Sequence, residues 1–119
     1  MAGFKGGMGN MQNLMREAQK MQEQMQEADK ELEEIEVVGL SGGGEEGDET
    51  VVVYMNGKKI INGIEFGSKL SSLVDITDED DVEMLEDLIM AAINDGYKKA
   101  DAVYDEKMGP FGKAGKGLF

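Results

Sequence analysis

The 119-residue sequence contains neither cysteine nor histidine. Without cysteine it has no disulfide and no thiolate nucleophile, and without histidine it lacks the commonest general base and the commonest metal ligand. No apolar run approaches the roughly 18 residues that span a membrane, and no signal peptide opens the chain. These absences argue against an enzyme, a metal or cofactor site and a membrane protein. We expect one small cytosolic domain over residues 1–119.

Acidic residues outnumber basic ones by 25 to 12, which gives a formal net charge of −13. The acid is concentrated in the middle of the chain: residues 31–95 sum to −15, residues 1–30 are neutral, and residues 96–119 sum to +2. Taken alone, the net charge disfavours nucleic acid and anionic membranes, because both are polyanions. Its distribution leaves the two ends of the chain as candidate binding segments.

Two helices are predicted from apolar periodicity. In residues 80–108 apolar side chains recur at steps of three and four, with Thr77 and Asp80 resembling a capping box and Gly109-Pro110 ending the helix. From Met11 a heptad pattern continues for about four heptads. It predicts a helical seam that meets another helix, in a dimer or, alternatively, the core of its own chain; its residues include Met11, Leu14, Met21, Met25 and Leu32.

Three strands are expected between the helices. A short strand begins near Ile35, and the β-rich runs 50–55 and 58–66 flank Asn56-Gly57, which predicts a type I′ hairpin turn. Gly63 marks a bulge. The order is α-β-β-β-α, with glycine-rich flexible tails at 1–10 and 109–119. So small a sheet does not cover two long helices, so we expect an α+β homodimer with long projecting helices.

Two apparent chemical motifs have simpler explanations. Residues 39–43 match the G-x-S-x-G nucleophile elbow, but a strand follows them and the chain has no histidine partner. The carboxylates between Asp75 and Asp81 lack the EF-hand spacing and suit the start of a helix, where the dipole favours negative charge. Neither motif predicts catalysis or metal binding.

The basic side chains form two groups, one near the start of the first helix and one in the last turns of the second. If the helices pack antiparallel, the groups come together in one region suited to phosphate contact rather than base reading. A cation near a helix C-terminus is also explained by the helix dipole alone. The two groups are Lys5, Arg16 and Lys20, and Lys98, Lys99 and Lys107, with Lys113 and Lys116 in the tail.

Five segments in order resemble the YbaB/EbfC family of bacterial nucleoid-associated proteins: GGMGNMQNLMREAQKMQEQMQE, VVGLSGGG, VVVYMNGKK, DDVEMLEDLIMAAINDGYKKA and the glycine-rich tail. The resemblance implies a homodimer whose long helices project from a shared sheet like tweezers and bind DNA. The matching basic positions are Arg16, Lys20, Lys98 and Lys99; Lys5 and the tail lysines match more loosely.

Two hypotheses follow. The first is a cytoplasmic, nucleoid-associated homodimer that grips double-stranded DNA through phosphate contacts, with roles in nucleoid organisation and gene regulation. The second is an acidic dimeric protein-interaction module with weak or no DNA binding and an unidentified protein partner. It draws on the net charge of −13 and the methionine-rich seam.

Overall fold

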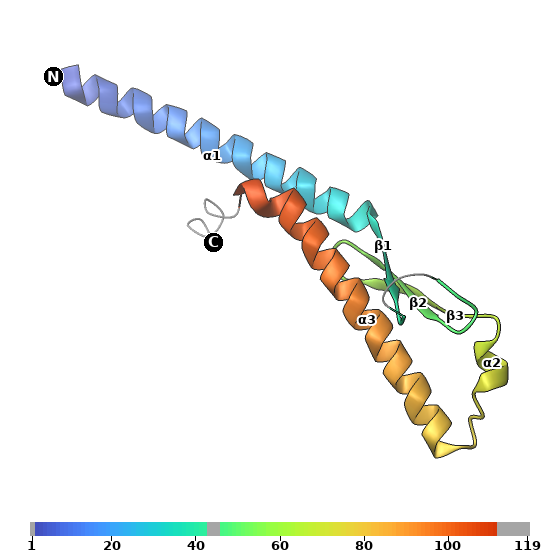
Figure 1. Cartoon of the computed structure of the whole chain (residues 1–119). Coiled ribbons are helices and arrows are strands. Elements are labelled where there is room, and N and C mark those ends of the chain that lie inside the picture. Colours follow the sequence, from blue (N-terminus) through green and yellow to red (C-terminus); the bar gives the residue numbers. More distant parts are fainter. Residues whose placement is uncertain (1, 43–45, 112–119) are drawn as a thin grey trace.

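The computed structural model describes the backbone of residues 2–42 and 46–111, and the side chains from residue 10 onward within those ranges. It has the predicted α+β layout of a long helix, a three-stranded antiparallel sheet and a second long helix (Figure 1). The elements are α1 (Ala2–Glu34), β1 (Glu36–Leu40), β2 (Val51–Asn56), β3 (Ile61–Phe66), α2 (Leu70–Leu73), α3 (Glu79–Met108) and the 3₁₀ turn η1 (Gly109–Phe111). Helix α1 thus begins well before Met11, where the heptad pattern starts. The flexibility of the two tails stays a prediction, and residues 112–119 lie outside the described residues.

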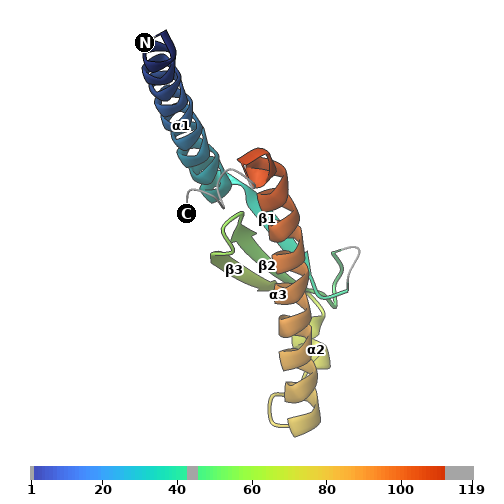
Figure 2. The ribbon, with the colours of Figure 1, turned by 90° about the vertical axis from the view of Figure 1, so that its left-hand side faces the viewer.

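The core lies between α3 and one face of the sheet. The strands pair antiparallel in the order β1-β2-β3. Val51, Val53 and Met55 of β2 are fully buried and form one cluster with Ala92 and Ala100 of α3. Helix α3 packs on β1 and β2, and Figure 2 shows β3 to one side of it. One strand of the sheet is therefore left without a helix over it.

Glycine lets α3 approach the sheet closely. A Cβ added at Gly39 of β1 would come within 2.1 Å of the Ala92 carbonyl oxygen and 2.7 Å of the Gly96 amide nitrogen. Gly96 is itself buried, and a Cβ there would lie 3.2 Å from the Met55 sulfur. Strand and helix backbones therefore meet at a point where neither carries a side chain.

Helix α1 makes the molecule elongated. The chain measures 82 × 21 × 20 Å, and its radius of gyration of 22.6 Å exceeds the value of about 13.5 Å expected for a compact domain of this length. The C-terminal turns of α1 contact α3 and the β2–β3 loop, whereas its N-terminal half projects away from the sheet and α3 (Figures 1 and 2).

The hairpin turn differs from the predicted type I′ turn. The loop is wider, because Asn56 pairs with Ile60: the Asn56 amide donates to the Ile60 carbonyl, and the Asn56 side chain accepts from the Lys58 and Ile60 amides at 2.8 and 3.1 Å. The positive φ falls on Lys59, at 67°. Gly57 serves a different purpose, since its amide donates to the Leu32 carbonyl of α1 at 2.8 Å and a Cβ would clash there. Asn56-Gly57 therefore predicts the position of the hairpin correctly and its type of turn wrongly.

The pairing of β3 has the predicted irregularity. Gly63 faces Tyr54 of β2, whereas the next pair joins Ile61 to Met55, so Asn62 is an extra residue in β3. The bulge expected at Gly63 therefore lies directly beside it.

The segment between β3 and α3 is more ordered than a plain linker. Its short helix α2 inserts Leu70 into the core, where the side chain is 3% exposed. The N-cap of α3 is Asp78 rather than Thr77: its carboxylate accepts from the Asp80 amide at 2.9 Å and the Asp81 amide at 3.4 Å. Thr77 instead donates through its hydroxyl and, second, its amide to Asp75, and these bonds hold the pKa of that carboxyl below its usual value.

Replacing Gly39 by alanine tests the close contact between β1 and α3. The new methyl group meets backbone atoms that cannot rotate away, so we expect the free energy of unfolding to fall by about 1–3 kcal/mol in urea denaturation. Gly42→Ala is the matched control, because nothing lies within 4 Å of a Cβ at that exposed position. Equal stability of the two variants would show that the crossing tolerates a side chain.

Candidate nucleic-acid interface

The projecting part of α1 carries basic side chains that have no acidic partner in the described structure. Every residue from 10 to 20 is exposed, including Arg16 and Lys20. Lys30 lies in the C-terminal part of α1, within the same sector of about 80° of the helix surface. It is not among the predicted residues, although the 100° spacing of helical residues indicates its place in this sector. None of the three forms an ion pair within 4.0 Å with a described residue. Glu23 and Glu27 share this sector, so the surface is mixed rather than uniformly basic.

The two adjacent lysines of α3 have different surroundings. Lys98 is exposed and has no ion pair with a described residue. The Lys99 ammonium donates to the Val38 carbonyl at 3.0 Å and to Asp95 at 2.9 Å. Asp95 also accepts from the Leu40 amide at 2.9 Å, so the pair ties α3 to β1. Lys99 therefore has a structural role, although the sequence suggests a phosphate contact.

The environment of Asp95 favours its ionised form. The Lys99 ammonium, followed by the Leu40 amide, lowers the pKa of the Asp95 carboxyl, and partial burial opposes them. The Asp95 side chain is 24% exposed, so this contact is partly shielded from water. The link between α3 and β1 therefore strengthens when Asp95 is charged.

Other lysines near the helix crossing are also engaged within the chain. Lys107 pairs with Glu31 of α1 at 3.0 Å. Lys58, in the β2–β3 loop, pairs with Asp29 at 2.8 Å and Glu33 at 3.4 Å. The side chain of Lys5 lies outside the described residues. Of the predicted phosphate-binding residues within the described structure, Arg16, Lys20 and Lys98 remain without an internal partner.

The helices do pack antiparallel, but the two basic groups do not meet. The Lys107–Glu31 contact aligns the end of α3 with the last turns of α1. Lys20 lies about 16 Å from that point along α1, and Lys98 lies about 14 Å from it in the opposite direction along α3. The expectation of a single basic region is therefore wrong for one chain, because α1 contacts α3 through its C-terminal turns.

The predicted helical seam divides into two parts. Leu32 is fully buried in its own chain, and Met21 and Met25 are half-buried. Met11 and Leu14 are 64% and 62% exposed and have no cover in the chain. Packing on the chain's own core, the alternative for this seam, thus applies to its C-terminal end; a dimer contact at the other end stays a prediction.

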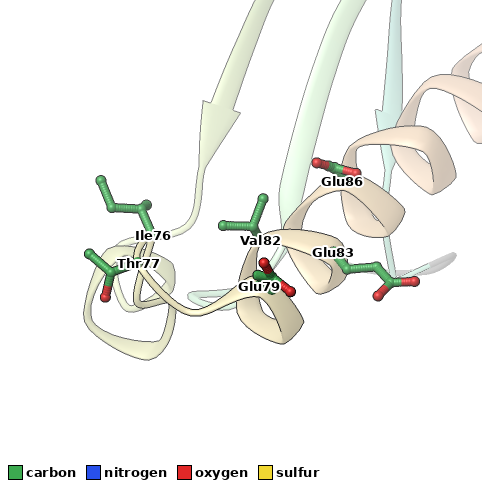
Figure 3. Close-up of a pocket in the computed structure, with 6 residues that line it drawn as sticks. All are labelled: Ile76, Thr77, Glu79, Val82, Glu83 and Glu86. Carbon is green, nitrogen blue, oxygen red and sulfur yellow. The ribbon is translucent and has the colours of Figure 1, made fainter.

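An acidic depression lies at the opposite end of the molecule, where α3 begins. Figure 3 shows Ile76 and Thr77 on the preceding loop and Val82 on the helix, with the three glutamates Glu79, Glu83 and Glu86 pointing in different directions. Their carboxylates do not converge, and across residues 2–42 and 46–111 no group of acidic side chains is arranged to hold a metal ion.

Among the helices that the structure describes, none has an apolar stretch long enough to cross a membrane.

Acid should weaken the contact between α3 and β1. Because the folded-state pKa of Asp95 lies below the usual value near 4, its stabilising effect is complete above that pH and is lost as the pH falls through the folded value. We expect Asp95→Asn to lower the free energy of unfolding by about 1–2 kcal/mol at pH 7. The difference in this free energy between the native and variant proteins should shrink as the pH falls below about 4.

Urea unfolding at several pH values measures this difference. Asp87→Asn is the control, since Asp87 is exposed and forms no ion pair with a described residue. A constant difference between native and Asp95→Asn proteins from neutral to acidic pH would contradict the assignment.

Comparison with known proteins places the chain in a family. A model of the YbaB/EbfC DNA-binding family matches residues 8–115. The chain is 49% identical to a nucleoid-associated protein of Agathobacter rectalis and 45% identical to one of Clostridium perfringens, with 98% of this chain and 96% of each relative covered. It is 48% identical to a nucleoid-associated protein of Geobacillus kaustophilus, over 92% of this chain and 91% of the relative. The chain therefore belongs to the YbaB/EbfC DNA-binding family.

Proposed function

We propose that this protein is a nucleoid-associated protein that binds duplex DNA as a homodimer in the bacterial cytoplasm, with roles in nucleoid organisation and gene regulation. The observation that carries the proposal is the projecting half of α1, which presents Arg16 and Lys20 without an internal acidic partner in the described structure. The family and the names of the relatives support DNA as the partner.

Arg16 and Lys20 can attract phosphate because they project away from the acidic sheet and α3. Residues 31–95 sum to −15, so the sheet and the first half of α3 repel phosphate. Arg16 lies about 24 Å along the helix from Leu32, the buried residue that anchors α1. We call the projecting N-terminal half of α1 the arm. The distance is about three Debye lengths at physiological ionic strength, so the negative field of the sheet and α3 is largely screened at the arm. Binding then depends on short-range phosphate contacts and has little sequence preference.

The uncovered strand supports a homodimer. Ile61, Ile64 and Phe66 of β3 pair with the buried β2 residues Met55, Val53 and Val51 and thus lie on the same sheet face as the core. They are nevertheless 39–52% exposed in one chain, because α3 covers only β1 and β2. A second copy of the chain would cover this apolar face and bring two arms into one particle.

The second hypothesis has its own observation. The exposed end of the seam, with Met11, Leu14 and Met15 each more than 60% exposed, offers an apolar stripe to a helical protein partner. An acidic protein-interaction module would use this stripe and would bind duplex DNA weakly or not at all.

The double variant Arg16→Gln/Lys20→Gln tests the DNA-binding proposal. Fluorescence anisotropy with a random-sequence duplex, repeated over a range of salt concentrations, should show weaker binding. The slope of log K against log salt should fall by about 0.9 for each phosphate contact removed. Lys59→Gln/Lys69→Gln is the control with the same charge change, because those lysines pair with Asp101 and Asp48 away from the arm.

Three outcomes have different meanings. Selective loss of binding in the α1 variant supports the phosphate grip. Equal loss in both variants would mean that overall charge, not the arm, governs binding. Absence of binding by the native protein even at low salt would overturn the proposal in favour of a protein partner.

Ile64→Asp tests the dimer. A charge in the uncovered face of β3 should dissociate the dimer without unfolding the chain, since the side chain is already 45% exposed in one copy. Light scattering should then report one chain instead of two. Met84→Asp introduces the same group at an exposed position of α3 and should leave the mass unchanged. A native protein that is already monomeric would contradict the proposed dimer.

A further inference from the structure

The last turns of α1 carry negative charge where the helix dipole disfavours it. Glu31, Glu33 and Glu34 lie in the last four residues, and the turn contains no basic residue. Carboxylates are stabilising near a helix N-terminus and destabilising near a C-terminus, by up to about 1 kcal/mol each at an exposed site. Two of these three side chains have lysine partners from other elements, which offsets the unfavourable position.

Two lysines hold α1 from roughly opposite sides. Lys58 of the β2–β3 loop contacts Asp29 and Glu33 at 2.8 and 3.4 Å, while Lys107 of α3 contacts Glu31 at 3.0 Å. Asp29 and Glu33 are one turn apart, and Glu31 lies about 160–200° around the helix from them. We call these five residues the α1 clamp: Asp29, Glu31, Glu33, Lys58 and Lys107.

The other contacts of α1 lie along one side of the helix, where Ala28 is buried and Met21 and Met25 are half-buried. The Leu32 side chain is fully buried, and its carbonyl accepts from the Gly57 amide at 2.8 Å. Contacts on one side alone leave α1 able to rock about Leu32 unless its flanks are also held. Because Arg16 lies about 24 Å away, a rotation of about 10° at Leu32 would move it by about 4 Å. That displacement is as large as a salt-bridge distance.

We infer that Lys58 and Lys107 are positioning residues that set the direction of the DNA-binding arm through the α1 clamp. This inference rests on the proposed function for its consequence, namely that a directed arm binds phosphate better than a mobile one. The two lysines act through α1 and are not themselves phosphate ligands. Each clamp pair is partly exposed, so each alone is weak, and the direction of α1 depends on their acting together from two sides.

The inference predicts the opposite sign from a simple charge effect. Neutralising the acidic residues of the clamp with Asp29→Asn/Glu31→Gln/Glu33→Gln removes three negative charges, which by electrostatics alone would tighten DNA binding. If the clamp directs the arm, affinity should instead fall roughly three- to tenfold. The control Glu23→Gln/Glu27→Gln/Glu34→Gln makes the same charge change on the same helix, at exposed positions without an ion pair in the described structure. It should bind more tightly than the native protein.

A distance measurement gives a readout that does not involve DNA. The chain has no cysteine, so Gln19→Cys and Ala102→Cys provide two unique sites for spin labels on exposed positions of α1 and α3. The labelled chain is refolded with a large excess of unlabelled chain, so that only distances within one chain are recorded. The distance distribution should be narrow in the native and control proteins and broad in the clamp variant.

A charge exchange separates pairing from total charge. Glu31→Lys alone places two lysines together and should broaden the distribution, whereas Glu31→Lys/Lys107→Glu restores the pair with the native net charge and should narrow it again. A clamp variant with a narrow distribution, or one that binds DNA as tightly as the control, would overturn the inference. If the native protein binds no DNA, the proposed function fails, while the distance distributions still decide whether the clamp directs α1.

Discussion

The contact between Gly39 of β1 and Gly96 of α3 determines much of the architecture. With no side chain on either backbone, α3 lies directly on β1, and the small residues Ala92 and Ala100 continue the close approach along the helix. At this distance Lys99 reaches the Val38 carbonyl. A helix seated over β1 and β2 cannot also cover β3. The uncovered apolar face of β3, and with it the proposed dimer, therefore follows from the glycine contact.

The position of α3 also decides how α1 can project. Because α3 ends at Met108, its last turn reaches only the C-terminal turns of α1, through Lys107 and Glu31. The N-terminal half of α1 projects away from the sheet and α3, and residues 10–20 in it are exposed. Shape thus separates most of the acidic residues from this part of α1: they crowd the sheet, its loops and the first half of α3. Arg16 and Lys20, which share their surface with Glu23 and Glu27, lie beyond most of that field in physiological salt.

The fold was predictable where signals are local. The order of elements, the end of α3 at Gly109-Pro110 and the hairpin at Asn56-Gly57 all depend on neighbouring residues. The roles of the lysines were not predictable in the same way: the Val38 carbonyl that Lys99 contacts and the Glu31 carboxylate that Lys107 contacts lie 61 and 76 residues away in the sequence. A lysine near a helix end looks the same in a sequence whether it meets a phosphate or a carbonyl. Only the tertiary contacts show that Lys99 is bonded within the chain whereas its neighbour Lys98 has no ion pair with a described residue.

The phosphate contacts proposed for α1 and the ion pairs of the α1 clamp respond to salt in the same direction. The phosphate contacts proposed for Arg16 and Lys20 would weaken as salt rises, because counterions released into a more concentrated salt solution gain less entropy. The exposed pairs of the α1 clamp weaken over the same range, because salt screens them. Added salt would then loosen both the grip and the direction of the arm. The slope of log K against log salt would then overstate the number of phosphates that the protein contacts. These contacts can be counted from the slope only if the clamp stays equally intact at every salt concentration.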